Sequence, residues 1–211
     1  MIEYANYFVE QTLKRDLAML KTATNPAAEL AFLIPNRISA TDRLAWATRV
    51  YGAGILIRRG LTPTSTDWRP TIAVVQESGG SDGTQPLGLG TQLVNDTDGN
   101  PRVLSVIPGM SQVRIILMSN SFDDVRVLMS FTFSAIATMA TWLLGSSNGS
   151  GSGLTNLVFA GMADIVPDES MLPEGVVQAV GSSLTFMFSG MNVTPHIGAF
   201  TGTVSEFLSI A

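Results

Sequence analysis

The sequence contains no cysteine among its 211 residues. This absence excludes disulfide bonds, thiolate metal sites and cysteine nucleophiles, and it leaves the redox compartment of the protein open. Lysine is almost absent too, since Lys14 and Lys21 are the two in the chain, and the ten arginines are scattered. With a net charge of −5 the chain offers no basic surface for a phosphate backbone, so we expect no direct recognition of nucleic acid.

Charged side chains of both signs are scarce as well. They make up 14% of the chain, against 45% hydrophobic residues, whereas a typical soluble domain carries roughly 25% charged residues. A chain of this composition buries much of its surface in an oligomer or enters a membrane. Its 211 residues suffice for one domain with a sizeable core, and two globular domains would be a tight fit. We therefore predict a single domain over residues 1–211.

One uncharged run has the length of a membrane span. Val127 to Leu144 comprises eighteen residues without a charge. Five of them are Ser or Thr, and no cluster of Lys or Arg flanks the run, which is atypical of a transmembrane helix. We favour a protein without a membrane, and a membrane-associated protein spanning at Val127–Leu144 is the alternative from another class. Expression without detergent separates the two, because a spanning helix would send the chain to the membrane fraction.

The first part of the chain carries helical patterns. Within Ile2 to Lys21, apolar residues recur on one helical face, which predicts an amphipathic helix in an N-terminal arm over residues 1–25. These apolar residues are Val9, Leu13, Leu17 and Leu20. After a short apolar run from Leu30 to Ile34, Ser39 is placed to cap a second helix, which we expect Gly52 and Gly54 to end. Strand candidates follow at Ile55 to Ile57 and at Thr71 to Gln76.

Residues 77–111 are predicted to form an extended loop and hairpin insertion. The stretch from Gly79 to Gly90 is rich in Gly, Ser and Pro, as a long loop is. Asp96 to Asn100 contains an Asp-Gly pair between two apolar runs, which is a hairpin signal. We expect this surface to contact a partner and to become ordered against it. The residues assigned to the contact are Asp82, Gln85, Asp96 and Asp98.

Residues 112–195 are expected to form the core as strand, helix, strand and strand. Val113 to Met118 has an apolar strand pattern, and Ser121 is placed to cap the helix that follows. Two later strands are predicted, over Leu157 to Met162 and over Val176 to Phe188, the second with Val180, Leu184, Phe186 and Phe188 on one face. The expected fold class is α/β (α+β), a small mixed twisted sheet with one long helix, Phe122 to Leu144, packed across it.

The long helix has an unusual polar face. Its hydroxyl residues recur at spacings of four, four and three, and they are Ser130, Ser134, Thr138 and Thr141. A solvent-facing helix would normally carry Lys and Glu there. The opposite side, which includes Leu128, Phe131, Ala135, Met139 and Trp142, is apolar. We therefore predict that the hydroxyl stripe is an oligomer interface, covered by another protein.

Fragments of catalytic motifs occur in contexts that do not support catalysis. Gly145 to Gly149 matches the pattern of a nucleophile elbow around Ser147, but that elbow needs a strand before it and a helix after it. Here a helix precedes and a Gly/Ser linker follows. The single histidine, His196, has no serine in a suitable context. A hydrolase built on either residue is the remote alternative, and we predict that the protein is not an enzyme.

Signals for a metal or a cofactor are equally incomplete. Asp96, Asp98 and Asn100 have the spacing of a calcium loop, but Pro101 stands where that loop requires glycine. The acidic residues Asp164, Asp168, Glu169 and Glu174 could hold a metal, yet interleaved prolines favour a solvated loop. Gly88-Leu89-Gly90 lacks the third glycine of a dinucleotide fingerprint. We expect no metal and no cofactor.

Three patches of the chain resemble tail-terminator proteins of contractile-tailed bacteriophages. The first is the core order: the strand at Arg114 to Met118, the helix start at Ser121 to Asp124, and the closing strand at Ser183 to Phe186. The second is the extension from Asn192 to Pro195, and the third is Leu33 to Pro35 leading into Ser39 to Arg43, which is similar to a strand-to-helix transition in that family. The uncharged long helix departs from the family, whose members commonly carry charges along it.

The resemblance implies a structural virion protein, assembled in the host cytoplasm, that forms a hexameric ring at the end of the tail. Such a ring contacts the last tail-tube ring and the last sheath ring on one side and the neck on the other. Another neck, head-completion or baseplate subunit is the alternative within virion proteins. A ring would also offer each long helix a neighbour to cover its hydroxyl stripe.

Overall fold

A computed structural model describes the backbone of residues 5–60, 69–81, 91–95, 101–145, 154–167 and 180–195, and the side chains of residues 5–60, 69–77, 110–139, 157–166 and 180–189. The helices are α1 (Ala5–Thr22), α2 (Pro26–Phe32), α3 (Ala40–Ala53) and α4 (Phe122–Gly145). The strands are β1 (Leu56–Arg59), β2 (Thr71–Ser81), β3 (Thr91–Asn95), β4 (Pro101–Ser119), β5 (Leu154–Met162), β6 (Val166–Pro167) and β7 (Val180–Pro195). The predicted α+β class with a mixed sheet is confirmed.

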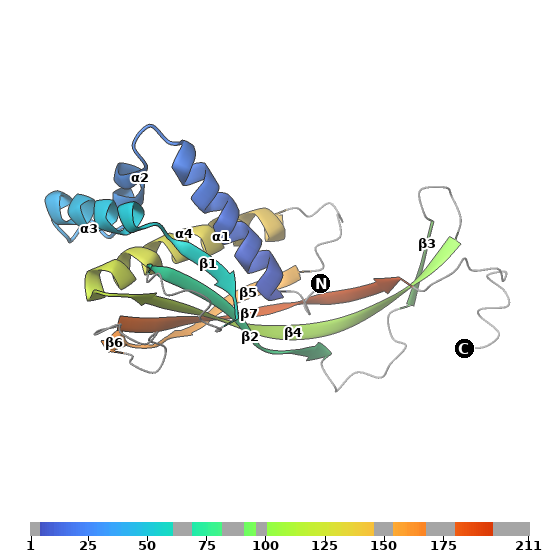
Figure 1. The fold of residues 1–211 in the computed structure, drawn as a ribbon. Coiled ribbons are helices and arrows are strands. Elements are labelled where there is room, and N and C mark those ends of the chain that lie inside the picture. Colours follow the sequence, from blue (N-terminus) through green and yellow to red (C-terminus); the bar gives the residue numbers. More distant parts are fainter. Residues whose placement is uncertain are drawn as a thin grey trace.

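The strands form one sheet in the order β1-β2-β4-β7-β5, with β3 added to β4 and β6 added to β7. β1 and β2 are parallel, and the other pairs are antiparallel, so the sheet is mixed. β4 and β7 pair from Leu104 opposite Pro195 to Ser119 opposite Val180. The Pro101 end of β4 and the Pro195 end of β7 project beyond the helices as a long arm, with β3 beside its tip (Figure 1).

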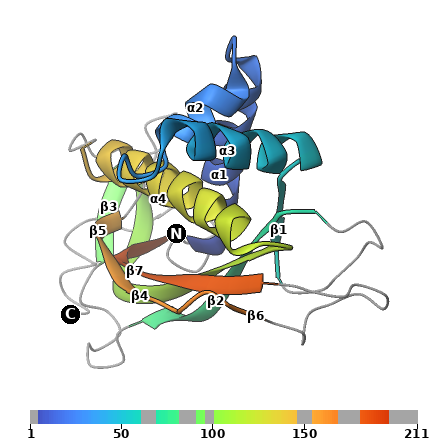
Figure 2. The ribbon, with the colours of Figure 1, turned by 90° about the vertical axis from the view of Figure 1, so that its left-hand side faces the viewer.

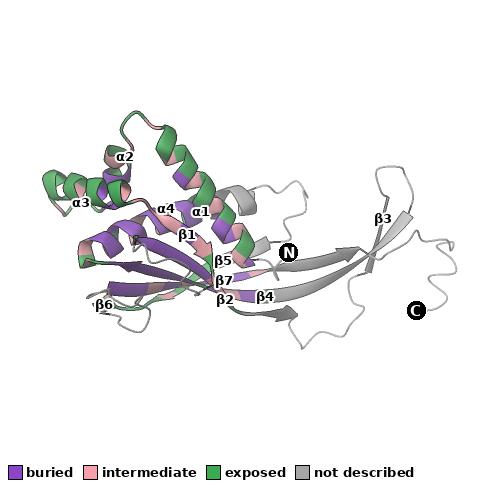
Figure 3. Cartoon of the chain, viewed as in Figure 1, coloured by how far each residue is buried: buried purple, intermediate pink, exposed green. Residues whose placement is uncertain are grey.

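The helices all lie on one side of the sheet, where α1 and α4 pack against the strands and α2 and α3 lie farther out against α4 (Figure 2). β7 contributes the alternating residues Val180, Leu184, Phe186 and Phe188 to this core, and all of them are buried as predicted. From α4 come Leu128, Phe131, Ala135 and Met139, and from α1 come Val9, Leu13 and Leu17. Figure 3 shows the buried residues concentrated on α4 and on the central strands beneath it. The strand period of 2 and the helix period of 3.6 therefore place the apolar residues where the sequence predicted.

Capping residues fix the ends of three helices. The Ser39 hydroxyl accepts a hydrogen bond from the Asp42 amide at 3.1 Å, so the predicted start of α3 is confirmed. Gly54 closes that helix with φ of 81°, a backbone conformation that favours glycine, and its amide bonds the Tyr51 carbonyl. At α4, the Asp124 amide donates to the Ser121 hydroxyl at 3.3 Å. The side chain of Asn25 caps α2 in the same way.

Several elements differ from the expectation. Leu33 to Pro35 is no strand, because the chain from Pro26 to Phe32 forms α2 and the segment after it is a turn into α3. Pro at the first helical turn and the Asn25 cap outweigh the apolar run there. Gly79 to Ser81 continue β2, paired with Gly109 to Ser111. The predicted limit between residues 111 and 112 falls inside β4, which is one strand of 19 residues. None of the helices in the described ranges combines the length and hydropathy of a membrane span.

Candidate assembly surfaces

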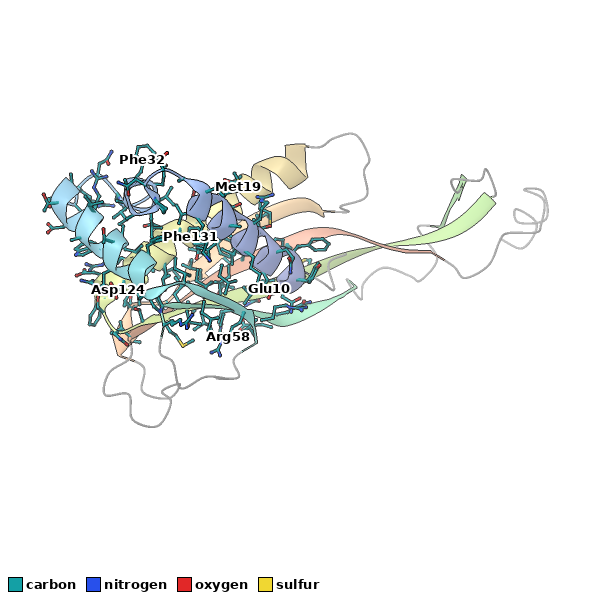
Figure 4. All side chains as sticks on the ribbon, turned by 45° about the horizontal axis from the view of Figure 1, so that its top comes forward. Glu10, Met19, Phe32, Arg58, Asp124 and Phe131 are labelled. Carbon is teal, nitrogen blue, oxygen red and sulfur yellow. The ribbon has the colours of Figure 1, made fainter. Side chains whose placement is uncertain are left out.

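The hydroxyl stripe of α4 faces a groove between α1, α2 and α4. The groove has a volume of about 590 Å³. Its lining residues are Arg15, Asp16, Met19, Leu20 and Ala23 from α1 and the turn after it, Glu29 and Leu33 from α2 and its cap, and Phe131, Ser134, Ala135 and Thr138 from α4. Met19 and Phe131 mark two of its sides in Figure 4. The structure thus brings two of the four predicted stripe residues, Ser134 and Thr138, to one concave surface.

The stripe residues differ in how far the chain itself covers them. Ser130 and Ser134 are half-buried, Thr138 is exposed, and Thr141 lies outside the residues whose side chains are described. The Thr138 hydroxyl donates to the Ser134 carbonyl at 3.0 Å, the bond to the residue four back that lets a threonine lie on an uncharged helix face. This face therefore needs no charged side chain to satisfy its polar groups. Coverage of the stripe by another protein stays a prediction.

The groove is apolar at its base and carries charge at its rim. Phe131 and Ala135 are buried beneath it, while Met19 is 64% exposed beside it. Arg15 pairs with Asp16 at 3.0 Å on the rim. An exposed methionine next to a concave apolar surface is typical of an adaptable protein contact. The groove therefore offers apolar contacts at its base and an ion pair at its rim.

A buried carboxylate ties α3 to the turn between β4 and α4. Asp124 is 5% exposed and accepts a hydrogen bond from Arg49 Nε at 2.7 Å through Oδ1. The buried hydroxyl of Ser119 donates to the other carboxylate oxygen, Oδ2, at 3.2 Å. Arg49 also donates to the Ser121 hydroxyl at 3.2 Å. This network orients the first turn of α4, and hence the stripe, against the rest of the fold.

A second buried carboxylate ties α1 to the edge strand β1. Glu10 is 5% exposed and lies between Lys14 Nζ at 2.7 Å and Arg59 Nε at 2.6 Å. Arg59 in turn lies over the ring of Tyr7, 5.3 Å from its centroid. Sequence reasoning placed Asp124 in the first turn of the long helix and Glu10 off the apolar face of the first helix, and it predicted the burial of neither carboxylate. The spacing of Glu10 and Lys14 is a local signal that could have found one pair, whereas the partners Arg49 and Arg59 are distant in the sequence.

Of the residues considered for chemistry, the structure describes Asp164. Asp164 is exposed on the connection between β5 and β6. The remaining candidates lie outside the described residues, and they are Ser147, Asp168, Glu169, Glu174 and His196. Among the side chains that the structure places, no three His, Cys, Asp or Glu residues are grouped so that they could hold a metal ion. The predicted partner-contacting residues Asp82, Gln85, Asp96 and Asp98 also lie outside the described ranges, although the strands flanking the second pair form the predicted hairpin.

No protein-family model matches the sequence, and no curated protein matches it.

Proposed function

We propose that the protein is a structural virion subunit that forms a ring, ends the tail of a phage, and joins the tail tube and sheath to the neck. The proposal takes the tail-terminator resemblance as its starting point. Its mechanism is mechanical: a preformed surface stops polymerisation and joins two assemblies without turnover. Six copies in a ring is the stoichiometry that the resemblance implies.

The long arm of β4 and β7 is the observation that carries the proposal. β4 has 19 residues and β7 has 16, whereas strands in globular proteins usually have roughly 3–10. At about 3.3 Å per residue, β4 alone spans about 60 Å. No described helix covers the Pro101 end of β4 (Figure 1). A chain that extends its sheet so far from its own core is built to reach another molecule.

The composition of the arm supports the same conclusion. Together, β3, residues 101–110 of β4 and residues 189–195 of β7 carry one charged residue, Arg102. A narrow β ribbon is marginally stable in water unless something packs against it. The side of β7 away from β4 has no described partner strand beyond Gly190, and an unpaired, uncharged strand edge is a template for pairing with another chain. Neighbouring subunits of a ring, or a tail or neck protein, would supply that cover.

Two measurements test the proposal. Negative-stain microscopy and light scattering of the purified protein should show a closed ring with the mass of several copies. A monomer at every concentration would contradict the ring.

Labelling virions with an antibody against this chain should then place it at the junction of tail and neck. Label at the distal end of the tail would favour a baseplate subunit, and label within the head vertex would favour a head-completion protein.

A further inference from the structure

One edge of the sheet has the features of a pairing surface. β5 and β6 run along the same side of β7, from Leu154 opposite Gly190 to Pro167 opposite Val180. No described strand pairs with the outer side of this edge. The outward backbone N–H and C=O groups of such a strand are available to a strand from another chain.

The side chains of this edge are apolar and exposed. Val158, Phe159, Met162 and Val166 are between 46% and 55% exposed. Residues 154–163 contain no charge. Proteins normally protect an exposed edge with charged residues or by keeping the strand short. Here two bulges interrupt the edge, and between them Asn156 to Phe159 keep a regular register with β7.

The opposite edge of the same sheet is different. β1 is four residues long, Leu56 to Arg59, and ends in two arginines. Its length equals that of the regular stretch from Asn156 to Phe159. Arg59 is held in place by Glu10 and by the ring of Tyr7. Partial burial lowers the pKa of the Arg58 guanidinium from its ordinary value. Figure 4 shows Arg58 at the side of the sheet where β1 lies.

The two edges carry opposite charge in the sequence. Residues 154–167, which include β5 and β6, contain one acidic residue, Asp164, and no Lys or Arg. β1, at the other edge, carries Arg58 and Arg59 and no acidic residue. Pairing the β5–β6 edge with itself would bring two copies of Asp164 to one contact, whereas pairing it with β1 of a neighbour brings Asp164 to an edge that carries Arg58 and Arg59.

We infer that the edge formed by β5 and β6 pairs with β1 of a second copy of this chain, head to tail, so that the sheet continues from one subunit into the next. Contact between two different surfaces repeats around an axis and closes into a ring when the rotation allows. The inference rests on the proposed function in one respect, namely that the subunits form a closed ring.

The absence of cysteine makes a direct test possible. Leu56 and Val158 lie on the same face of the sheet, the face away from α4. Leu56 lies on this face beside its partner Thr71 on β2, and Val158 lies on it beside its partner Met187 on β7. Adjacent strands are about 4.8 Å apart. Mixing the single variants Leu56→Cys and Val158→Cys and adding a short bis-maleimide should therefore produce a covalent dimer in the mixture and in neither variant alone. A dimer from Val158→Cys alone would overturn the inference in favour of a symmetric edge contact.

The oligomeric mass, measured on the same samples before cross-linking, separates this inference from the proposed function. A closed ring that yields no cross-link would overturn the edge pairing and leave the ring intact. A mixed cross-link in open filaments would support the edge pairing and contradict the ring.

A charge variant gives a second test. Val158→Lys should raise the protein concentration at which the oligomer dissociates by roughly tenfold or more, because a desolvated, unpaired charge at an interface is costly. Leu44→Lys is the matched control, since Leu44 is 44% exposed on α3, away from both edges. Circular dichroism of both variants checks that they fold. Equal dissociation of the two folded variants would overturn the inference.

Discussion

Replacing Asp124 with alanine should destabilise the protein much more than replacing its neighbour Asp123. The Asp124 carboxylate is 5% exposed and is held by Arg49 at 2.7 Å and by Ser119 at 3.2 Å. Asp123 pairs instead with Arg126 at 3.2 Å, one helical turn along, with 35% of its side chain exposed. Both acids lie in the first turn of α4, so their interactions with the helix dipole are similar.

The magnitude follows from what each change leaves behind. Removing the Asp124 carboxylate deprives Ser119, which is 1% exposed, of its acceptor; an unsatisfied buried hydroxyl costs about 1–3 kcal/mol. The Arg49 side chain is 51% exposed and is solvated by water once the carboxylate is gone, so the loss of its ion pair contributes little to the destabilisation. We expect Asp124→Ala to lower the free energy of unfolding by about 2–4 kcal/mol. Asp123→Ala should cost about 0.5 kcal/mol or less.

Urea unfolding followed by circular dichroism measures both changes. The double variant Arg49→Ala with Asp124→Ala adds a check, because a real contact makes its effect smaller than the sum of the two single effects. Equal midpoints for Asp124→Ala and Asp123→Ala would refute the reasoning that the buried network holds the start of α4.

Four further results are expected. Glu10→Ala should lower the free energy of unfolding by about 1–3 kcal/mol, whereas Glu29→Ala, which removes an exposed acid, should lower it much less. Similar urea midpoints for these two variants would contradict the role of Glu10. Thr132 is fully buried on α4, and its hydroxyl has no hydrogen-bond partner among the described residues. Thr132→Val should therefore raise the free energy of unfolding by about 1 kcal/mol, and a lower melting temperature of the variant would contradict this expectation. Ser134→Arg should reduce the oligomeric mass, with Thr48→Arg on α3 as the control; an unchanged mass would leave the groove without a role in assembly. Residues 202–211 include the apolar side chains Phe207 and Leu208, which we expect to be buried against the sheet or a neighbouring subunit, so deleting these residues should lower the oligomeric mass in light scattering; the same mass at the same concentration would show that residues 202–211 take no part in assembly.

Local signals in the sequence were sufficient for several of the elements and their buried faces. The spacing of Val9, Leu13 and Leu17 predicted the buried face of α1, and Ser39 and Ser121 predicted the starts of α3 and α4. These features depend on residues within one or two turns of each other, so they can be recognised without knowing the fold. The same holds for the alternation along β7. The strand that the family resemblance implied at Leu33 to Pro35 was wrong, because the helix signals just before it were stronger, and the Gly/Ser-rich pattern was misleading at Gly79 to Ser81, which continue β2.

Tertiary structure alone decided the features that join distant parts of the chain. Gly109 and Pro108 break the strand pattern of β4, and its pairing with β7, joined at Gly109 by pairing with β2, carries the strand through them. The contacts of Arg49 with Asp124 and of Arg59 with Glu10 link elements far apart in sequence. The groove at Ser134 and Thr138, and the contrast between the two sheet edges, likewise depend on which elements become neighbours. Long-range pairing is set by the sum of packing over the whole core, and no local pattern in the sequence encodes it.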